Sequence, residues 1–264
     1  MEALKTDYLE TARNLPPPPD ARENILSALR RGLPEFQPAL FPHDGHMIVC
    51  GSGPSLPSFI EEIKQERKQR RPIIAVKGAH DLLCANGIEP DIFVSCEAKP
   101  RLENVQYRNT KTVYMLSSRC SPELFDWLQK ANILLWHSYV PPEKEAPMPE
   151  LTDKHLIGGG TTSGLRAITL GYVMGFANFT LYGFDSCLEL STKKKRYDSG
   201  AMKPEQIVDR IVRGRRFLCN GAMSMQADEF QELYKIHPDA TFDVKGEGLL
   251  AAIIEDRKHR GLRT

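Results

Sequence analysis

The chain has 264 residues, which is enough for one large α/β domain with an extension. Lys and Arg number 35 and Asp and Glu number 34, so the formal net charge of +1 excludes a global electrostatic attraction to nucleic acid or membranes. Six cysteines form no C-x-x-C pair, and no apolar run approaches the roughly 18 residues of a membrane helix. We therefore expect a cytoplasmic protein with reduced thiols.

Residues 1–45 differ in composition from the rest of the chain and predict an N-terminal arm. Four consecutive prolines, Pro16 to Pro19, favour an extended polyproline segment. Asp20 has the chemistry of an N-cap for a helix that runs to Leu29. We interpret the arm as a packing segment or an oligomer contact, and residues 46–264 as the nucleotide-binding domain.

The run Ile48-Val-Cys-Gly-Ser-Gly-Pro-Ser-Leu56 predicts a strand, a tight turn and the start of a helix. Two glycines let the turn take positive φ and let a phosphate approach the backbone. The proline fits a first helical turn, and the serine after it leaves a hydroxyl and an amide at the positive end of that helix. We expect a donor phosphate to be held by Gly51, Ser52, Gly53, Pro54 and Ser55.

Short apolar runs then alternate with helical segments, a pattern typical of a doubly wound, mostly parallel sheet. The predicted strands are 73–76, 92–96, 112–116, 133–136 and 179–182, and the predicted helices are 57–71, 79–87, 122–130 and 165–176. Residues 139–153 carry four prolines and many charges and predict a surface loop or lid. Residues 186–200 predict a mobile loop beside the site, and beyond it we expect helices from 204, over 223–234 and over 249–255, with a strand at 215–219.

A second glycine-rich turn, Gly158 to Gly164, also feeds a helix. A dinucleotide fold fits poorly, because Leu56 replaces the third glycine of the motif and Lys77 stands where a ribose-binding acid is expected. A P-loop also fits poorly, because Leu165 and Arg166 follow in place of Lys and Ser or Thr. The two turns together suit a mononucleotide, held by Lys77 and by Gly159, Gly160, Thr161, Thr162 and Ser163.

Candidate catalytic residues follow the predicted strands. Glu97 and Asp185 come just after strands, where a carboxylate can hold a metal such as Mg²⁺, a ribose hydroxyl or a proton in transit. His80 is the best-placed general base or phosphate contact, unless it caps a helix, and His137 is a second choice. Neither histidine has a Ser or Cys partner at a recognisable spacing, so a hydrolase triad has no support.

Three segments together resemble a known family: residues 48–56, residues 75–97, and residues 158–163 with Leu181-Tyr-Gly-Phe-Asp185. They resemble the DUF115 family, whose relatives include the archaeal 6-hydroxymethylpterin diphosphokinase (MptE-like) enzymes and the motility accessory factor (Maf) proteins of flagellin glycosylation. The tail from Gly214 resembles a phage and prophage branch, which would place the protein in the host cytoplasm. The first and third segments are also similar to bacterial sialyltransferases that use a CMP-activated sugar.

This resemblance implies a Rossmann-like fold and transfer from a nucleotide-activated donor. A glycosyltransferase-like enzyme that uses a nucleotide sugar is our main hypothesis, and a Mg²⁺-dependent pyrophosphokinase that uses ATP is the alternative. A nucleotide-binding module without turnover and a DNA-modification protein remain as further alternatives. The acceptor is unknown.

The sequence departs from these relatives in two places. Glu97 stands where the family has Asp, and no His occurs between Asp185 and His237, where sialyltransferases place a catalytic His. Tyr197, His80 or a carboxylate would then serve as the base. Lys77 and the run Lys193 to Arg196 would neutralise the leaving diphosphate, although a solvated loop or a contact with a nucleic-acid acceptor also accounts for that run.

Overall fold

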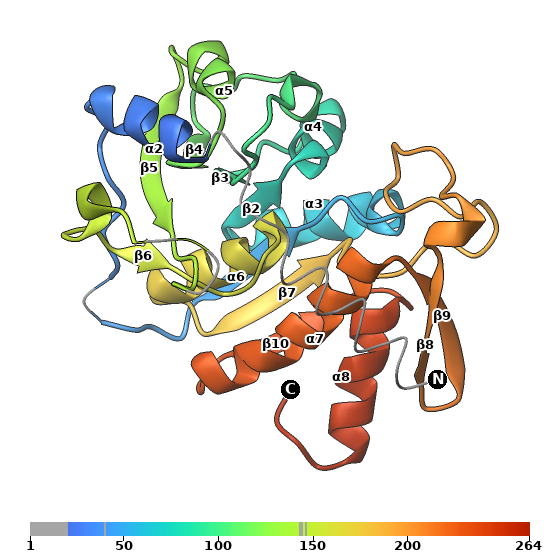
Figure 1. The fold of residues 1–264 in the computed structure, drawn as a ribbon. Helices are drawn as coiled ribbons and strands as arrows, with labels where there is room; N and C mark the ends of the chain where they lie inside the picture. The colour runs from blue at the N-terminus through green and yellow to red at the C-terminus, as the bar shows by residue number, and fades with distance from the viewer. Residues whose placement is uncertain (1–20, 40, 143–144, 146) are drawn as a thin grey trace.

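The computed structural model describes residues 21–264 apart from 40, 143–144 and 146. The polyproline run and the Asp20 cap lie outside these residues. An eight-stranded sheet in the order β10-β7-β1-β2-β3-β4-β5-β6 forms the centre of the molecule, and every adjacent pair is parallel (Figure 1). The prediction of a Rossmann-like, doubly wound α/β fold is confirmed.

The strands of the sheet are β1 (His46–Cys50), β2 (Ile73–Val76), β3 (Ile92–Ser95), β4 (Val113–Ser117), β5 (Asn132–Ser138), β6 (Leu156–Ile157), β7 (Asn178–Tyr182) and β10 (Thr241–Val244). The helices are α2 (Ala21–Arg30), α3 (Ile60–Lys68), α4 (Gly78–Ala85), α5 (Pro122–Trp127), α6 (Ser163–Val173), α7 (Gly221–Ile236) and α8 (Leu249–His259). No helix in the described part of the chain is both long enough and apolar enough to cross a bilayer.

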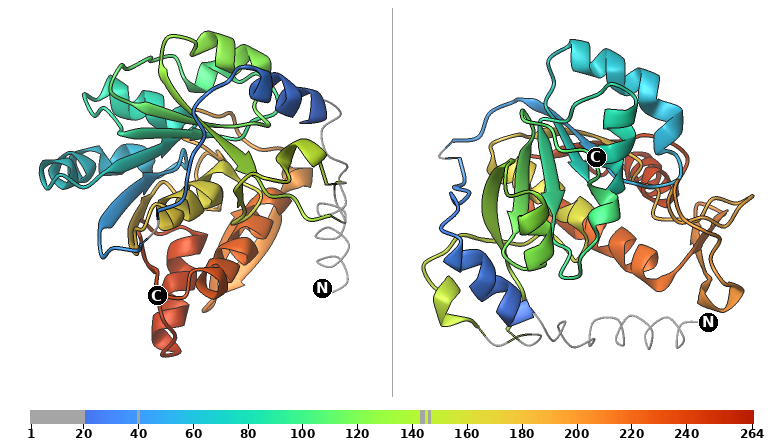
Figure 2. Two further views of the ribbon diagram at one scale, coloured as in Figure 1. Left: turned by 90° about the vertical axis from the view of Figure 1, so that its left-hand side faces the viewer. Right: turned by 90° about the horizontal axis from the view of Figure 1, so that it is seen from above.

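Helices cover both faces of the sheet because its strands are apolar on both sides (Figure 2). Along β1, Met47 and Val49 belong to the core that α6, α7 and α8 share. Ile48 and Cys50 point the other way, into the core formed with α3 and α4. A third core joins α2 and α5 to β3, β4 and β5.

The described part of the predicted arm packs on the domain. The backbone N–H of Phe36 donates to the carbonyl of Leu135 at 2.7 Å, and the N–H of Leu135 donates to the carbonyl of Pro34 at 2.8 Å. Just after α2, the guanidinium of Arg31 lies 2.8 Å from the Asp126 carboxylate of α5. Residues 34–36 therefore cover the first half of the β5 edge, and β6 pairs with its second half.

The C-terminal region differs from the prediction in three places. Strand β10 extends the sheet beyond β7, although the sequence pattern did not predict it. The helix expected from residue 204 is only a 3-10 turn, Pro204–Gln206. Strand β8 (Val208–Val212) was not predicted either. It pairs antiparallel with β9 (Arg215–Cys219), the strand predicted at 215–219, in a hairpin that stands apart from the main sheet (Figure 1).

Candidate functional site

A cavity of about 280 Å³ opens at the carboxyl ends of β1, β2 and β7. The strand order reverses at β1, because β2 to β6 follow on one side while β7 and β10 lie on the other. Open α/β sheets bind ligands in the crevice at such a switch point. The lining residues are Gly51, Ser52, Gly53, Val76, Lys77, Thr162, Ser163, Gly164, Gly183, Phe184, Asp185, Ser186, Lys195, Arg196, Asn220, Ala222, Met223 and Gln226.

The turn after β1 contacts the turn after β7 through their backbones. The N–H of Gly53 donates to the Gly183 carbonyl at 2.9 Å. A Cβ on Gly53 would lie 2.2 Å from the Asp185 carboxylate and 2.5 Å from the Gly183 carbonyl, so a larger residue does not fit. The glycines of the opening motif therefore let two chain turns meet at the edge of the cavity.

Pro54 and Ser55 are displaced from the role that the motif predicts. They line a neighbouring cavity, and the Ser55 N–H donates to the Asp185 carboxylate at 3.1 Å. The following helix begins as a short 3-10 turn, Leu56–Phe59, before α3. The N-terminus of α3 therefore does not face the switch-point cavity.

Two other helices start at this cavity instead. Thr162 caps α6, since its side chain accepts from the Leu165 N–H at 3.3 Å. Asn220 caps α7, since its side chain accepts from the Met223 N–H at 2.9 Å. Gln226 connects the two helices by donating to the Thr162 hydroxyl at 3.1 Å. Helix N-termini carry partial positive charge, so this pair favours an anion.

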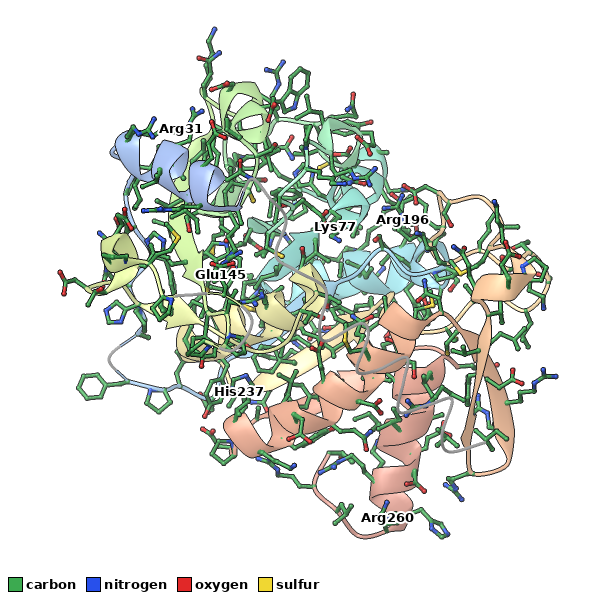
Figure 3. All side chains as sticks on the ribbon, viewed as in Figure 1. Arg31, Lys77, Glu145, Arg196, His237 and Arg260 are labelled. Carbon is green, nitrogen blue, oxygen red and sulfur yellow. The ribbon has the colours of Figure 1, made fainter. Side chains whose placement is uncertain are left out.

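Three cationic side chains, Lys77, Lys195 and Arg196, add to this positive field. Figure 3 labels Lys77 and Arg196, which line the same cavity although Lys77 follows β2 and Arg196 belongs to the distant loop 186–200. Lys77 has φ 51° and Ser186 has φ 48°, a region that residues other than glycine seldom adopt. Backbone strain of this kind is concentrated at ligand-binding and catalytic sites.

Tyr197 anchors the loop that carries Lys195 and Arg196. Its hydroxyl donates to the Gly78 carbonyl at 2.6 Å, in the first turn of α4. Arg196 also pairs with Asp198, with 3.0 Å between guanidinium and carboxylate. The loop has internal hydrogen bonds and a bridge between residues 194 and 201, so it is structured beside the cavity.

Only part of the second glycine turn reaches the cavity. Thr162 and Ser163 line it, but Gly159 packs so closely on α6 that a Cβ would lie 1.8 Å from the Thr169 hydroxyl. Gly160 packs on Leu165, where a Cβ would lie 2.7 Å from the side chain. The hydroxyl and the N–H of Thr161 both donate to Glu229 of α7, at 2.9 and 3.0 Å. Gly159, Gly160 and Thr161 therefore shape the turn rather than line the cavity.

The two candidate carboxylates do not form a metal site between them. Glu97 is ion-paired with Lys77 and does not line the cavity. Asp185 lines it and is 8% exposed, and burial raises the pKa of its carboxyl group. Within the described ranges no group of three or more His, Cys, Asp or Glu side chains is placed to hold a metal ion. The described residues around the cavity therefore do not fit a Mg²⁺ site.

Neither candidate histidine lines the cavity. His80 is fully buried, with Nδ1 3.0 Å from the Asp81 carboxylate and its ring 5.2 Å from that of Phe93. His137 is 3% exposed and lies 3.5 Å from the Glu35 carboxylate, and burial lowers its pKa. This placement gives His80 a packing role and does not support it as the base.

The sequence interpretation missed the contribution of α7. Asn220, Met223 and Gln226 line the cavity but lie far along the chain from both glycine turns. A local signal was present, because an Asn directly before the helix is a strong N-cap. The predicted helix began at residue 223, so the cap was overlooked.

The match to known proteins is clearest at the family level. The model of the family described as 6-hydroxymethylpterin diphosphokinase MptE-like matches residues 22–190. No curated protein matches the chain.

Two solved structures are similar in fold. One is the Maf glycosyltransferase from Magnetospirillum magneticum AMB-1, with a TM-score of 0.60 and 16% identity over 91% of this chain and 42% of that one. This chain therefore spans less than half of the Maf protein. The other is a mammalian sialyltransferase in complex with Gal-beta-1-3GalNAc-ortho-nitrophenol, with a TM-score of 0.44 and 11% identity over 93% of this chain and 86% of that one. Since the family model covers more than half of the chain, the chain belongs to the 6-hydroxymethylpterin diphosphokinase MptE-like family.

Proposed function

We propose that the protein is a transferase that binds a nucleotide-activated donor in the switch-point cavity and transfers its glycosyl group. One observation carries the proposal: a glycine turn, two helix N-termini and three cationic side chains meet in the same cavity. Each of these features favours phosphate. At about 280 Å³, the cavity suits the phosphates and the adjoining part of a nucleotide sugar.

The residues suggest how the reaction would be assisted. As the bond between the sugar and the donor phosphate breaks, negative charge grows on the phosphate oxygen. Lys77, Lys195 and Arg196 would stabilise this charge, together with the amides at the starts of α6 and α7. Asp185 is the carboxylate beside the cavity, and its raised pKa suits a group that takes a proton from an acceptor hydroxyl.

The family match supports a second candidate, pyrophosphoryl transfer from ATP. The same phosphate-binding residues would then hold the triphosphate. The products separate the two reactions, because pyrophosphoryl transfer leaves AMP, whereas glycosyl transfer leaves a nucleoside mono- or diphosphate from the nucleotide sugar. Phosphorus-31 NMR of the protein with ATP and Mg²⁺, or with CMP-, UDP- and GDP-sugars, would detect either outcome.

Binding can be tested before turnover by calorimetric titration with CMP, UDP, GDP and ATP, with and without Mg²⁺. We expect one nucleotide to bind and Lys195→Gln to weaken it about tenfold, since a charge-assisted contact is lost. Lys193→Gln is the matched control, because Lys193 lies in the same loop but does not line the cavity. The proposal fails if no nucleotide binds, or if both substitutions have the same effect.

A further inference from the structure

A second cavity, of about 720 Å³, adjoins the first at Asp185, which lines both. The turn after β1, residues 187–191, strand β9 and the segment Glu247–Gly248 enclose it. The N–H of Leu249 donates to the Asp185 carbonyl at 2.8 Å, and a Cβ on Gly248 would lie 2.6 Å from the Asp185 backbone. Asp185 is therefore fixed in the wall between the two cavities.

The charges of the two cavities differ. Lys77, Lys195 and Arg196 face the first, whereas Asp185, Glu189 and Glu247 line the second. Two arginines also line the second cavity, and each is ion-paired, as Lys77 and Arg196 are in the first. Arg215 lies 3.1 Å from the Glu255 carboxylate, and Arg216 lies 2.9 Å from that of Asp209. Among the described lining residues, the second cavity has three carboxylates and two arginines, whereas the first has three cationic side chains and one carboxylate. The second cavity is therefore less favourable to an anion than the first.

The second cavity also offers an apolar surface beside these polar groups. Leu188 and Phe217 are buried in its wall, and Leu190 is 64% exposed at its edge. Ser55 and Ser58 contribute hydroxyl groups. Carboxylates and hydroxyls at the sides, with apolar side chains between them, match a sugar ring, which has C–H faces and hydroxyl edges.

We propose that this cavity binds the acceptor and that the acceptor is a neutral sugar. This inference rests on the proposed glycosyl transfer. An acceptor hydroxyl oxygen forms the new bond to the donor's anomeric carbon, while the bond from that carbon to the phosphate oxygen breaks and its electron pair leaves with the phosphate. The hydroxyl proton passes to the Asp185 carboxylate, so the carboxylate in the shared wall connects the two substrates.

The test is saturation-transfer NMR of the full chain with methyl β-D-galactopyranoside and methyl α-D-glucopyranoside as neutral probes, and glucose 6-phosphate and galacturonate as anionic ones. We expect contact with at least one neutral probe and none with the anionic probes. Ser58→Trp should reduce the contact at least fivefold by filling the cavity. Glu247→Gln should weaken it about tenfold by removing a charged acceptor. Lys130→Trp is the control, because Lys130 is exposed and lines neither cavity.

The inference is overturned if no neutral glycoside makes contact, if the anionic probes bind equally well, or if neither Ser58→Trp nor Glu247→Gln changes the signal. Nucleotide titration of the same variants keeps the two proposals apart. Nucleotide binding without sugar binding would remove only the acceptor site. If the protein binds no nucleotide but binds a sugar, and Glu247→Gln weakens that binding, then the proposed function is wrong and the sugar site remains.

Discussion

Lys77 combines a strained backbone with a side chain in the positive cavity. Its φ of 51° and ψ of −135° suit glycine, and holding another residue there costs on the order of 1–3 kcal/mol. Lys77→Gly should therefore raise the free energy of unfolding by about 1 kcal/mol once the greater freedom of glycine in the unfolded chain is included. It should also weaken nucleotide binding at least tenfold. Urea denaturation and calorimetric titration measure the two effects.

Lys77→Met separates strain from charge. It keeps the strained backbone but removes the ammonium group, so affinity should fall as in Lys77→Gly without any gain in stability. If Lys77→Gly neither stabilises the fold nor weakens binding, the strain at this position has no connection with a ligand.

Among the elements, the second glycine turn divides into glycines that pack tightly and a glycine with free space around it. Gly159 has φ 92°, and a Cβ there would lie 1.8 Å from the Thr169 hydroxyl. Gly158 has no atom within 4 Å of an added Cβ and no positive φ. Gly159→Ala should therefore lower the free energy of unfolding by about 3 kcal/mol, whereas Gly158→Ala should change it by less than about 0.5 kcal/mol. Equal values from urea denaturation would contradict this division.

Within the described residues, one hydrogen bond connects the loop 186–200 to α4. Tyr197→Phe removes the hydroxyl that donates to the Gly78 carbonyl but keeps the ring, which packs partly against the core beneath α3 and α4. We expect a three- to tenfold loss of nucleotide affinity because Lys195 and Arg196 are held less firmly, and faster proteolysis within the loop. The free energy of global unfolding should fall by no more than about 1 kcal/mol. Unchanged affinity together with faster proteolysis would show that the loop position does not matter for binding.

At the scale of the molecule, the sequence predicted the central strands because each is a short apolar run between turn residues. Strand β10, Thr-Phe-Asp-Val, was missed because it is an edge strand in which only Phe242 and Val244 are buried. The sequence did not predict that residues 34–36 pair with the edge of β5. This pairing uses backbone atoms at Leu135 and therefore requires no side-chain pattern.

The candidate site was predicted in part for a related reason. Gly51, Gly53, Lys77 and Asp185 follow strands, and parallel strands bring their carboxyl ends to one edge. The contributions of Asn220 and Gln226 depend on how α7 packs beside α6, a tertiary contact that no local spacing encodes. His80 was expected at the same edge, but its position two residues inside α4 turns the ring into the core.

The stability of the whole fold should depend on pH through His237, at the C-terminal end of α7. Its ring is buried, stacks on Tyr172 at 4.1 Å, and lies 3.0 Å from the Thr169 hydroxyl of α6. Burial lowers its pKa to about 4, from an ordinary value of 6.5, so the unfolded chain binds more protons between these two values. The free energy of unfolding should therefore decrease as the pH is lowered through this range, by about 2 kcal/mol from pH 7.5 to pH 5.

His237→Gln should remove most of this contribution, because glutamine can still hydrogen-bond to Thr169 but does not titrate. His137 and His46 also have lowered pKa values from burial, so they supply the pH dependence that remains in the variant. Urea denaturation of both proteins at pH 7.5 and pH 5 gives the difference directly. If the two proteins lose the same stability on acidification, then His237 accepts its proton in the folded state at little cost, and the packing of α7 on α6 at this end must open far more readily than its burial implies.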